Sequence, residues 1–550
     1  MGNSGNGEGF EELHFRSLSR TWNNMIDLLI LNGNIIDGTG NPSYNGNLII
    51  EGDRIRIHRG HISDVETARV IDATGLVVSP GFIDLHSHGG LTMLREPKNE
   101  PKIRQGVTTE LIGIDGNAAA PFKTRDDLEA FIELDSGLND TMPVGRDWRS
   151  VDDFLSLFEM TVSPNIAFIL GNSQPRIWSV GWNDRPATGH ELEDMKSVVR
   201  EAMEDGAFGL STGLDYPPGA YADTNEIIEL CKVAAERGGF YHTHTRNSLS
   251  VNGHMAPFEE AVEIGRKSGA PVHLTHFRQS AQGTGSHLDY ISLVENSREE
   301  GLDVTFDCYT YIYSGTRMLI HLPNWTMDGG PERLKQVLHS SKDRARAKKD
   351  MLASPRPLNT EESWLTGFRK PHNKRYDGHS LAEIARICGQ DPFETLFDLL
   401  LDENLGISVV AIGTNAQTLP YFVAHPFGMI ASDAILFGEF PSPRTYGCFP
   451  VVLAEFVRAE KHLRLPEAIR KMTSLPAQRL GLRERGILKD GMKADITIFD
   501  PNTVKAPATR QRPKQFAQGI PYVIVNGVLV VEDGKHTGAT PGTVLRHGRD

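Results

Sequence analysis

The chain has 550 residues, of which 39% are hydrophobic and 23% are charged. These proportions are ordinary for a globular protein, and the length is enough for one large domain and a smaller one. A formal net charge of −14 at pH 7 argues against a nucleic-acid-binding surface.

The cysteine content and the apolar pattern point to the compartment. Four cysteines without a Cys-x-x-Cys pair are too few for a disulfide framework in a chain of this length. Residues 1–25 are polar and rich in Gly, Ser and Asn, and they lack the apolar core of a signal peptide. No apolar run reaches the roughly 18 residues of a membrane span. We therefore expect a cytoplasmic protein with a flexible N-terminal tail at residues 1–25 and no membrane partner.

Short strands broken by Gly-containing turns are predicted near both ends of the chain. They lie at residues 26–31, 46–51, 69–72, 486–500 and 522–531. Because the two ends share this pattern and the middle does not, we predict one small β-sandwich domain formed by residues 26–78 and 484–540. Two separate β caps are the alternative.

The middle of the chain alternates strand-like and helix-like patterns. Strands are predicted at Thr108–Ile114, Asn165–Leu170, Gly209–Thr212, Gly239–His244, Pro271–His276, Val304–Tyr309, Ser408–Ile412 and Met429–Ser432. Helices are predicted at Glu191–Glu204, Thr224–Arg237, Pro257–Ser268, Tyr290–Glu300 and Pro392–Glu403. With the run that ends at His86, these make eight or nine βα units, which predicts an α/β fold with a (β/α)8 TIM-like barrel at residues 79–483. Residues 324–375 fit the alternation poorly, and we interpret them as an insertion that forms a lid over the barrel mouth.

Two histidines, His86 and His88, end the first predicted barrel strand. Alternate side chains of a strand point to the same side, so both imidazoles can converge on one point. Two such imidazoles make half of a zinc site. Because the chain has 20 histidines, a His-x-His pair also arises by chance, and it is the position at a strand end that favours a metal role.

Four further candidate ligands lie at or just after predicted strand ends, namely Asp115, His244, His276 and Asp433. A carboxylate can bridge two metals or balance their charge, which is the role we expect for Asp115, and the alternative is that Asp115 caps the turn before Gly116. Asp433 is expected to touch a metal and to act as general base toward metal-activated water, and then to pass the proton to a departing amine. From spacing alone, His242 competes with His244, and His273 competes less well with His276.

Several segments together resemble the amidohydrolase superfamily and, within it, the N-acyl-D-amino-acid deacylase (D-aminoacylase) family. They are Pro80-Gly-Phe-Ile-Asp-Leu-His-Ser-His88, Gly106-Val-Thr-Thr109, Gly209-Leu-Ser-Thr-Gly-Leu-Asp-Tyr-Pro-Pro218, His244-Thr-Arg246, Thr275-His-Phe277, Asp307-Cys-Tyr-Thr-Tyr311, Ser432-Asp433 and Pro443-Arg-Thr-Tyr-Gly-Cys-Phe449. The resemblance runs from about Ile26 to Val531.

The resemblance implies roles for particular residues. It selects His244, two residues before Arg246, and it selects His276 in its Thr-His step as metal ligands. It also implies that Arg444 binds the substrate carboxylate, a task to which a guanidinium is suited. Tyr309 is implied to hold the substrate or to polarise the acyl oxygen.

The expected function is metal-dependent hydrolysis of the amide bond of N-acyl-D-amino acids, which gives a carboxylate and a D-amino acid. A metal-activated hydroxide would attack, with Asp433 as general base and one or two zinc ions as cofactor. The expected partner is a small N-acyl amino acid rather than a nucleic acid, and the oligomeric state stays open. The alternatives are a dihydroorotase- or hydantoinase-like cyclic-amide hydrolase, whose bridging lysine has no strand-end counterpart between Asp115 and His244, and a non-catalytic barrel scaffold.

One ligand position departs from the family. Its members typically place a cysteine where this chain has Asp115, and a carboxylate is a harder ligand than a thiolate. The sequence therefore leaves the number and identity of the metal ions open.

Overall fold

The computed structural model of the protein describes residues 26–62, 66–141 and 145–550. The flexible tail predicted at residues 1–25 lies outside these described residues.

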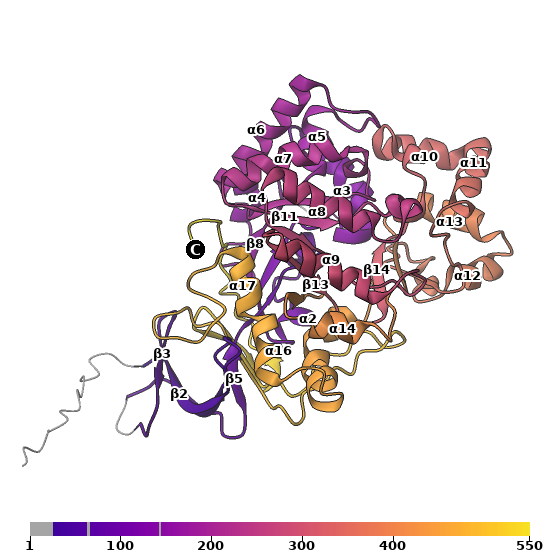
Figure 1. Ribbon diagram of the computed structural model, residues 1–550. Coiled ribbons are helices and arrows are strands. Elements are labelled where there is room, and N and C mark those ends of the chain that lie inside the picture. Colours follow the sequence, from indigo (N-terminus) through magenta and orange to yellow (C-terminus); the bar gives the residue numbers. More distant parts are fainter. Residues whose placement is uncertain (1–25, 63–65, 142–144) are drawn as a thin grey trace, which may run out of the picture.

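A single sheet combines strands from both ends of the described chain (Figure 1). Its strands are β1 (Leu28–Ile35), β2 (Tyr44–Glu51), β3 (Arg54–His58), β4 (Val70–Asp72), β5 (Val77–Pro80), β18 (Ile496–Phe499), β19 (Tyr522–Val525), β20 (Val528–Glu532) and β21 (Lys535–His536). The two ends meet where β5 pairs parallel with β1 and antiparallel with β18. Apolar residues of both ends, among them Ile30, Val78 and Ile496, pack into one buried cluster, which is the driving force for joining them. The domain boundaries at residues 78 and 484 stay a prediction.

Parallel strands form the barrel in the middle of the chain. They are β6 (Phe82–Asp84), β7 (Val107–Ile112), β8 (Asn165–Phe168), β9 (Leu170–Gly171), β10 (Gly209–Gly213), β11 (Phe240–His244), β12 (Val272–Leu274), β13 (Val304–Cys308) and β17 (Gly428–Ile430). If β8 and β9 are taken as one interrupted strand, these are the eight strands of a TIM-like barrel. The last and first strands meet through the backbone, because the N–H of Asp433 donates to the carbonyl of His86 at 2.9 Å and that of His88 donates to Ala434 at 3.0 Å.

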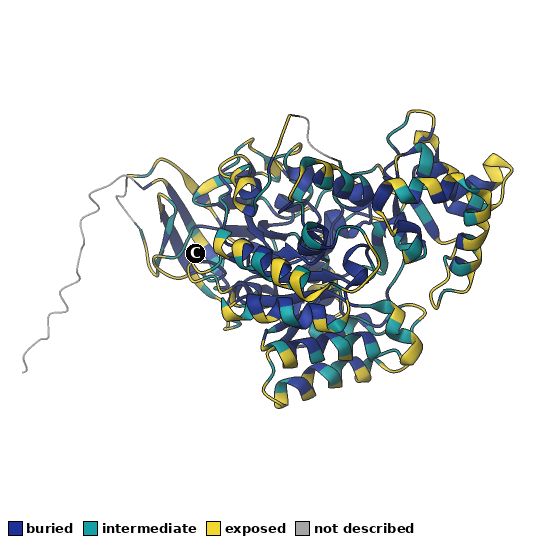
Figure 2. Cartoon of the chain, turned by 90° about the horizontal axis from the view of Figure 1, so that it is seen from above, coloured by how far each residue is buried: buried dark blue, intermediate teal, exposed yellow. Residues whose placement is uncertain are grey.

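Helices cover the outside of the barrel, and Figure 2 shows buried strands inside partly exposed helices. These helices are α3 (Arg125–Asn139), α4 (Val151–Ser156), α5 (Ser173–Ser179), α6 (Gly189–Asp205), α7 (Thr224–Glu236), α8 (Ala256–Ser268), α9 (His287–Glu299), α14 (Leu419–Ala424), α16 (Leu465–Met472) and α17 (Ser474–Leu480). Local sequence sets their ends: α6 begins at a capping box of Thr188 and Glu191 and ends at Gly206, whose φ of 110° suits glycine. Shorter helices are α1 (Gly90–Met93), α2 (Glu100–Ile103) and α15 (Arg444–Val451). None of the described helices combines the length and the apolar character needed to cross a membrane.

Between β13 and β17 the chain builds a lobe that lies away from β2 and β3 (Figure 1). It contains β14 (Tyr313–Arg317), β15 (Ser363–Thr366), β16 (Ser408–Ile412), α10 (Gly330–His339), α11 (Ser341–Leu352), α12 (Leu381–Cys388) and α13 (Pro392–Asp402). We predicted 408–412 as a strand of the barrel, and this was wrong, because it pairs antiparallel with β14 and β15 in a separate small sheet. Leu334, Leu365 and Phe397 belong to the lobe's own apolar cluster, so the segment has a core distinct from that of the barrel.

Candidate active site

The six predicted ligands all lie at the carboxyl ends of barrel strands. His86 and His88 follow β6, Asp115 follows β7, His244 is the last residue of β11, and His276 and Asp433 follow β12 and β17. The carboxyl ends of parallel strands open on the same face of a barrel, which is where its active site forms. The fold therefore brings together residues that are up to several hundred positions apart in the sequence.

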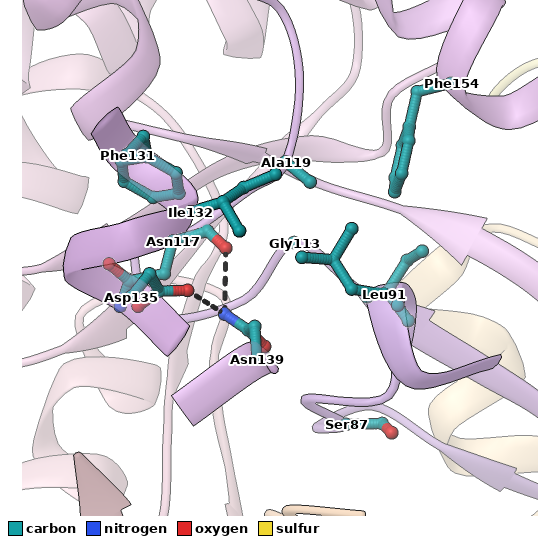
Figure 3. Close-up of a pocket in the computed structure, with 12 residues that line it drawn as sticks. Ser87, Leu91, Gly113, Asn117, Ala119, Phe131, Ile132, Asp135, Asn139 and Phe154 are labelled. Carbon is teal, nitrogen blue, oxygen red and sulfur yellow. Dashed lines mark hydrogen bonds between the residues drawn. The ribbon is translucent and has the colours of Figure 1, made fainter. Parts of the chain in front are cut away.

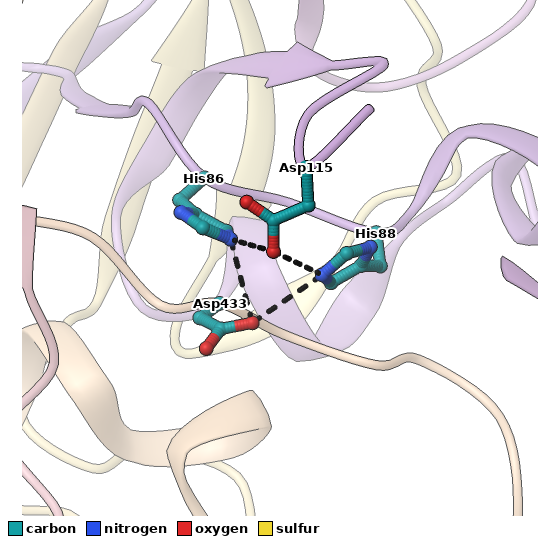
Figure 4. A group of neighbouring side chains, drawn as sticks. All are labelled: His86, His88, Asp115 and Asp433. Carbon is teal, nitrogen blue, oxygen red and sulfur yellow. Dashed lines mark ion pairs between the residues drawn. The ribbon is translucent and has the colours of Figure 1, made fainter. Parts of the chain in front are cut away.

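The first group of ligands is buried and tightly clustered (Figure 4). Asp115 Oδ2 lies 3.3 Å from His86 Nε2 and 3.8 Å from His88 Nε2. Asp433 Oδ1 lies 3.5 Å and 3.3 Å from the same two nitrogens. Two imidazole nitrogens and two carboxylate oxygens thus face one small volume, as the ligands of a divalent metal do.

The second group uses the same oxygen of Asp115. Its Oδ2 lies 3.7 Å from His244 Nδ1 and 3.7 Å from His276 Nε2. These two ring nitrogens are 3.0 Å apart. Because Asp115 Oδ2 belongs to both groups, it is placed as a bridging ligand would be.

Several features of these residues fit a metal of the zinc type. His86 Nε2 is buried and has no hydrogen-bond partner among the described residues, so a metal would satisfy it. Asp115, His276 and Asp433 hold positive φ angles of 54°, 36° and 49°. Such backbone is costly for residues other than glycine and is typical of functional sites. Imidazole and carboxylate donors suit zinc and also somewhat harder divalent ions.

The charges of the group depend on one another. Burial opposes charge on His86, yet the neighbouring Asp115 and Asp433 raise the pKa of its imidazole well above the ordinary value. Burial likewise opposes charge on Asp115, while His86, His244 and His276 hold the pKa of its carboxyl well below its usual range. The carboxylates therefore attract positive charge into this volume, and a metal cation can take the place of the protons.

A second layer of side chains, beneath the candidate ligands, contains the two competing histidines. His242 Nε2 lies 3.2 Å from the carbonyl of Leu85, and its ring stacks on His273 with centroids 5.3 Å apart. Neither ring lies with the group around Asp115, so His244 and His276 are the members of each pair that do.

Asp307 connects this layer to two ligands. Its Oδ1 accepts from the backbone N–H of His276 at 2.7 Å, and its Oδ2 lies 3.4 Å from His86 Nδ1 and 3.1 Å from His273 Nε2. A carboxylate on Nδ1 leaves the His86 Nε2 lone pair free for a metal. His86, His242 and Asp307 also lie close enough for a metal, but His86 Nε2 faces Asp115 and Asp433, so we assign Asp307 to support.

Asn139 plays the corresponding part for His88. Its Oδ1 lies 3.2 Å from His88 Nδ1, and its Nδ2 donates to Asp135 at 2.5 Å and to the carbonyl of Asn117 at 3.3 Å. Figure 3 shows Asn139, Asp135 and Asn117 at the wall of a small cavity, which is lined also by Leu91 and Phe154. The donors of Asn139 are occupied, so its oxygen must face His88 and accept the Nδ1 proton.

A cationic group lies beside the ligands. Arg444 Nη1 forms an ion pair with Asp433 Oδ2 at 2.9 Å, and Nη2 donates to the carbonyl of Gly315 at 3.1 Å. The guanidinium lies over the ring of Tyr309, 4.1 Å from its centroid. Both side chains are fully buried, and Tyr309 Oη and Arg444 Nε have no hydrogen-bond partner among the described residues. The two residues implied by resemblance as substrate-binding thus adjoin the candidate ligands.

Sequence reasoning missed several residues of the site. Asp307 was noted only as part of a segment, although an acidic residue inside a strand as apolar as 304–308 is itself a signal. Asp215, whose Oδ2 lies 3.0 Å from His244 Nε2, was likewise noted only as part of a segment, and Arg278, which stacks on Tyr309, was missed. Asn139 ends a helix and has no motif around it, so no local signal marks it.

A TIM-like barrel with histidines and aspartates gathered at its strand ends is typical of metal-dependent hydrolases. A model of the amidohydrolase family matches residues 69–151 and 361–531. D-aminoacylase of Alcaligenes xylosoxydans xylosoxydans is 33% identical over 96% of this chain and 99% of its own length. The chain therefore belongs to the D-aminoacylase family of amidohydrolases, as the resemblance predicted.

Solved structures agree in fold and in the nature of the centre. N-acyl-D-glutamate deacylase from Bordetella bronchiseptica, complexed with zinc and a phosphonate inhibitor, has a TM-score of 0.80 at 29% identity, covering 95% of this chain and all (100%) of that one. A D-aminoacylase with a binuclear metal centre has a TM-score of 0.77 at 31% identity and the same coverage, 95% and 100%. The predicted barrel with a small β domain is confirmed by these neighbours.

Proposed function

We propose that this protein is a metal-dependent deacylase that hydrolyses the amide bond of N-acyl-D-amino acids and releases a carboxylate and a D-amino acid. The observation that supports this most is the position of Asp115 Oδ2, which faces histidine nitrogens of both candidate ligand groups. The D configuration and the use of zinc come from the similarity to D-aminoacylase and to the zinc complex of the glutamate deacylase.

We assign the metal ligands to His86, His88, Asp115, His244, His276 and Asp433. When bound, a zinc-type ion would supply Lewis acidity, which would polarise the acyl carbonyl and lower the pKa of the attacking water so that it can lose a proton at neutral pH. The histidines hold their nitrogens toward that volume because Asp307 and Asn139 occupy the opposite nitrogens of His86 and His88.

Asp433 is the residue we assign to proton transfer. Burial would raise the pKa of its carboxyl, but the charges of Arg444 and His86 lower it to about 2, so Asp433 is ionised at neutral pH and can accept a proton. Oδ1 faces the histidines, whereas Oδ2 is held by Arg444. The carboxylate is thereby oriented to take a proton from the attacking water and to deliver it to the amine.

Arg444 and Tyr309 are assigned to the substrate. The Nε of Arg444 lacks an acceptor among the described residues, and the α-carboxylate of the substrate would supply one. The Tyr309 hydroxyl, which also lacks a partner there, can donate to the acyl oxygen. Both groups are buried, so they are shielded from water that would weaken such contacts.

A panel of N-acetyl-D- and N-acetyl-L-amino acids tests this proposal. We expect hydrolysis of the D series, with an initial rate that falls when the metal is removed by a chelator. Hydrolysis of the L series alone, or of cyclic amides alone, would refute the proposal.

The cytoplasmic location inferred from the sequence stays a prediction. It is supported by the cysteines, since Cys231, Cys308, Cys388 and Cys448 are all unpaired.

A further inference from the structure

A row of polar side chains crosses the barrel interior beneath the candidate ligands. His273 in β12 and Thr305 in β13 are paired in the parallel register of the two strands, and Asp307 lies two residues further along β13, on the same side. All three are buried, in a place that bulky apolar side chains fill in most barrels of this kind. Polar groups are costly there unless they are hydrogen-bonded.

Arg479 starts this row at the amino end of β13. It belongs to α17, its side chain is almost entirely buried, and its Nε donates to Thr305 Oγ1 at 2.9 Å. Its Nη1 and Nη2 donate instead to Asp303, an exposed residue directly before β13. A guanidinium can only donate, so Thr305 Oγ1 is the acceptor of the Nε bond.

The proton of the Thr305 hydroxyl is therefore directed to His273. Thr305 Oγ1 lies 2.9 Å from His273 Nδ1, and besides this contact and the bond from Arg479 it has no hydrogen bond to a described residue. The hydroxyl would be a buried donor without an acceptor unless it donates to Nδ1. Nδ1 then carries no proton, and His273 is held in the tautomer that is protonated on Nε2.

The ring of His273 is also neutral and fixed in orientation. Burial lowers the pKa of its imidazole, and the charges of Arg479 and His86 lower this pKa further, although Asp307 opposes them. The ring therefore carries one proton at neutral pH. His242 stacks on it with centroids 5.3 Å apart, which holds the plane of the ring.

The proton on His273 Nε2 points to the carboxylate that supports the ligands. Nε2 lies 3.1 Å from Asp307 Oδ2, the oxygen that also faces His86 Nδ1 at 3.4 Å. Asp307 Oδ1 accepts from the backbone N–H of His276 at 2.7 Å. In the other tautomer the lone pair of Nε2 would face Oδ2, and the two would repel each other.

We propose that Thr305 and Arg479 are positioning residues, which fix the tautomer of His273 from the amino end of β13. His273 in turn holds Asp307 in place behind two of the candidate ligands. The row acts through the direction of its hydrogen bonds and touches neither metal nor substrate, yet it sets metal affinity. This inference rests on the metal-dependent function proposed above.

The test compares zinc affinities of the full-length protein, measured by competition with a chelator. Thr305→Val keeps the shape of the side chain but removes the hydroxyl, and we expect the affinity for Zn²⁺ to fall by about 5-fold, the usual scale of one neutral hydrogen bond. Thr305→Ser retains the hydroxyl, so its affinity should stay within about 2-fold of the wild type.

A double-mutant cycle tests whether Thr305 acts through His273. His273→Gln offers an amide N–H to Asp307 that depends on no tautomer. In that background Thr305→Val should change zinc affinity by less than about 2-fold. Arg479→Met, which removes the donor to Thr305, should lower the affinity in the wild-type background and be equally silent beside His273→Gln.

Three results would overturn the inference. They are an unchanged zinc affinity in Thr305→Val, an equal loss in Thr305→Ser, and a loss from Thr305→Val that is as large beside His273→Gln as in the wild type. If His273→Gln does not fold, the comparison of valine with serine at position 305 still decides. Zinc affinity is measured without substrate, so a protein that meets these expectations and hydrolyses no N-acyl-D-amino acid would refute the proposed function alone.

Discussion

The two halves of the candidate site are built in different ways. The ligand half gathers His86, His88 and Asp115 with three further residues, all at the ends of barrel strands. In the cationic half, Tyr309 directly follows β13, Arg278 lies in the segment after β12, and Arg444 is the first residue of α15. The first half depends mainly on the barrel, which brings its strand ends together, whereas the second half also needs the segments after β12 and β17 to bring Arg278 and Arg444 to the ring of Tyr309. The barrel thus places the candidate metal ligands, and the segments beyond the strand ends place two of the three residues of the cationic half.

The largest effect is expected where both ligand groups meet. Asp115→Asn keeps the shape of the side chain but removes the charge that faces four histidines. We expect kcat/KM to fall by about 10³-fold or more, and the purified variant to hold less metal by elemental analysis. Full metal content with unchanged activity would show that Asp115 is not a shared ligand.

A substitution in the cationic half should weaken substrate binding. Arg444→Lys cannot maintain both the contact with Asp433 and a two-pronged contact with a carboxylate. We expect KM for N-acyl-D-amino acids to rise by about 10- to 100-fold, the range of one charge-assisted hydrogen bond. Metal content should stay at the wild-type level, and an unchanged KM would mean that the α-carboxylate binds elsewhere.

Asp307 supports the ligand half from below, and its substitution should lower metal affinity. Asp307→Asn weakens the hold on His86 Nδ1 and on the backbone of His276. We expect metal affinity, measured by competition with a chelator, to fall by about 10- to 100-fold. The matched control is Asp303→Asn, an acidic residue near the other end of the same strand that pairs with Arg479 and Arg298. Equal losses in the two variants would argue against a specific role for Asp307.

The smallest effect is expected for the neutral partner of His88. Asn139→Ala removes one uncharged hydrogen bond to His88 Nδ1. We expect metal affinity to fall by less than about 10-fold, because a neutral hydrogen bond contributes about 1 kcal/mol. If Asn139→Ala weakened metal binding more than Asp307→Asn, the ranking of the two supports would be reversed.

Much of the ligand half could be predicted from the sequence. Residue type and position at a strand end are local properties, and they are enough to indicate His86, His88 and Asp115. The choice of His244 over His242 was not local, because both side chains point to the same side of a strand. The family resemblance made that choice, and the structure places His242 in the layer below.

The rest could not be predicted, for physical reasons. The strand at 408–412 has the same apolar pattern whether it joins the barrel or pairs with β14 and β15, because periodicity does not name a partner. Asn139 reaches His88 only because α3 packs against the barrel in one particular position. The position of Arg278 beside the site is set by its contacts with Tyr309 and Thr414, which are distant in the sequence.

The most direct measurement of the central claim is metal titration of the metal-depleted protein with activity on an N-acyl-D-amino acid as the readout. The account predicts that chelator treatment removes the activity, that added zinc or a similar divalent ion restores it, and that Asp115→Asn is not restored. Full activity in protein shown by elemental analysis to contain no metal would contradict it.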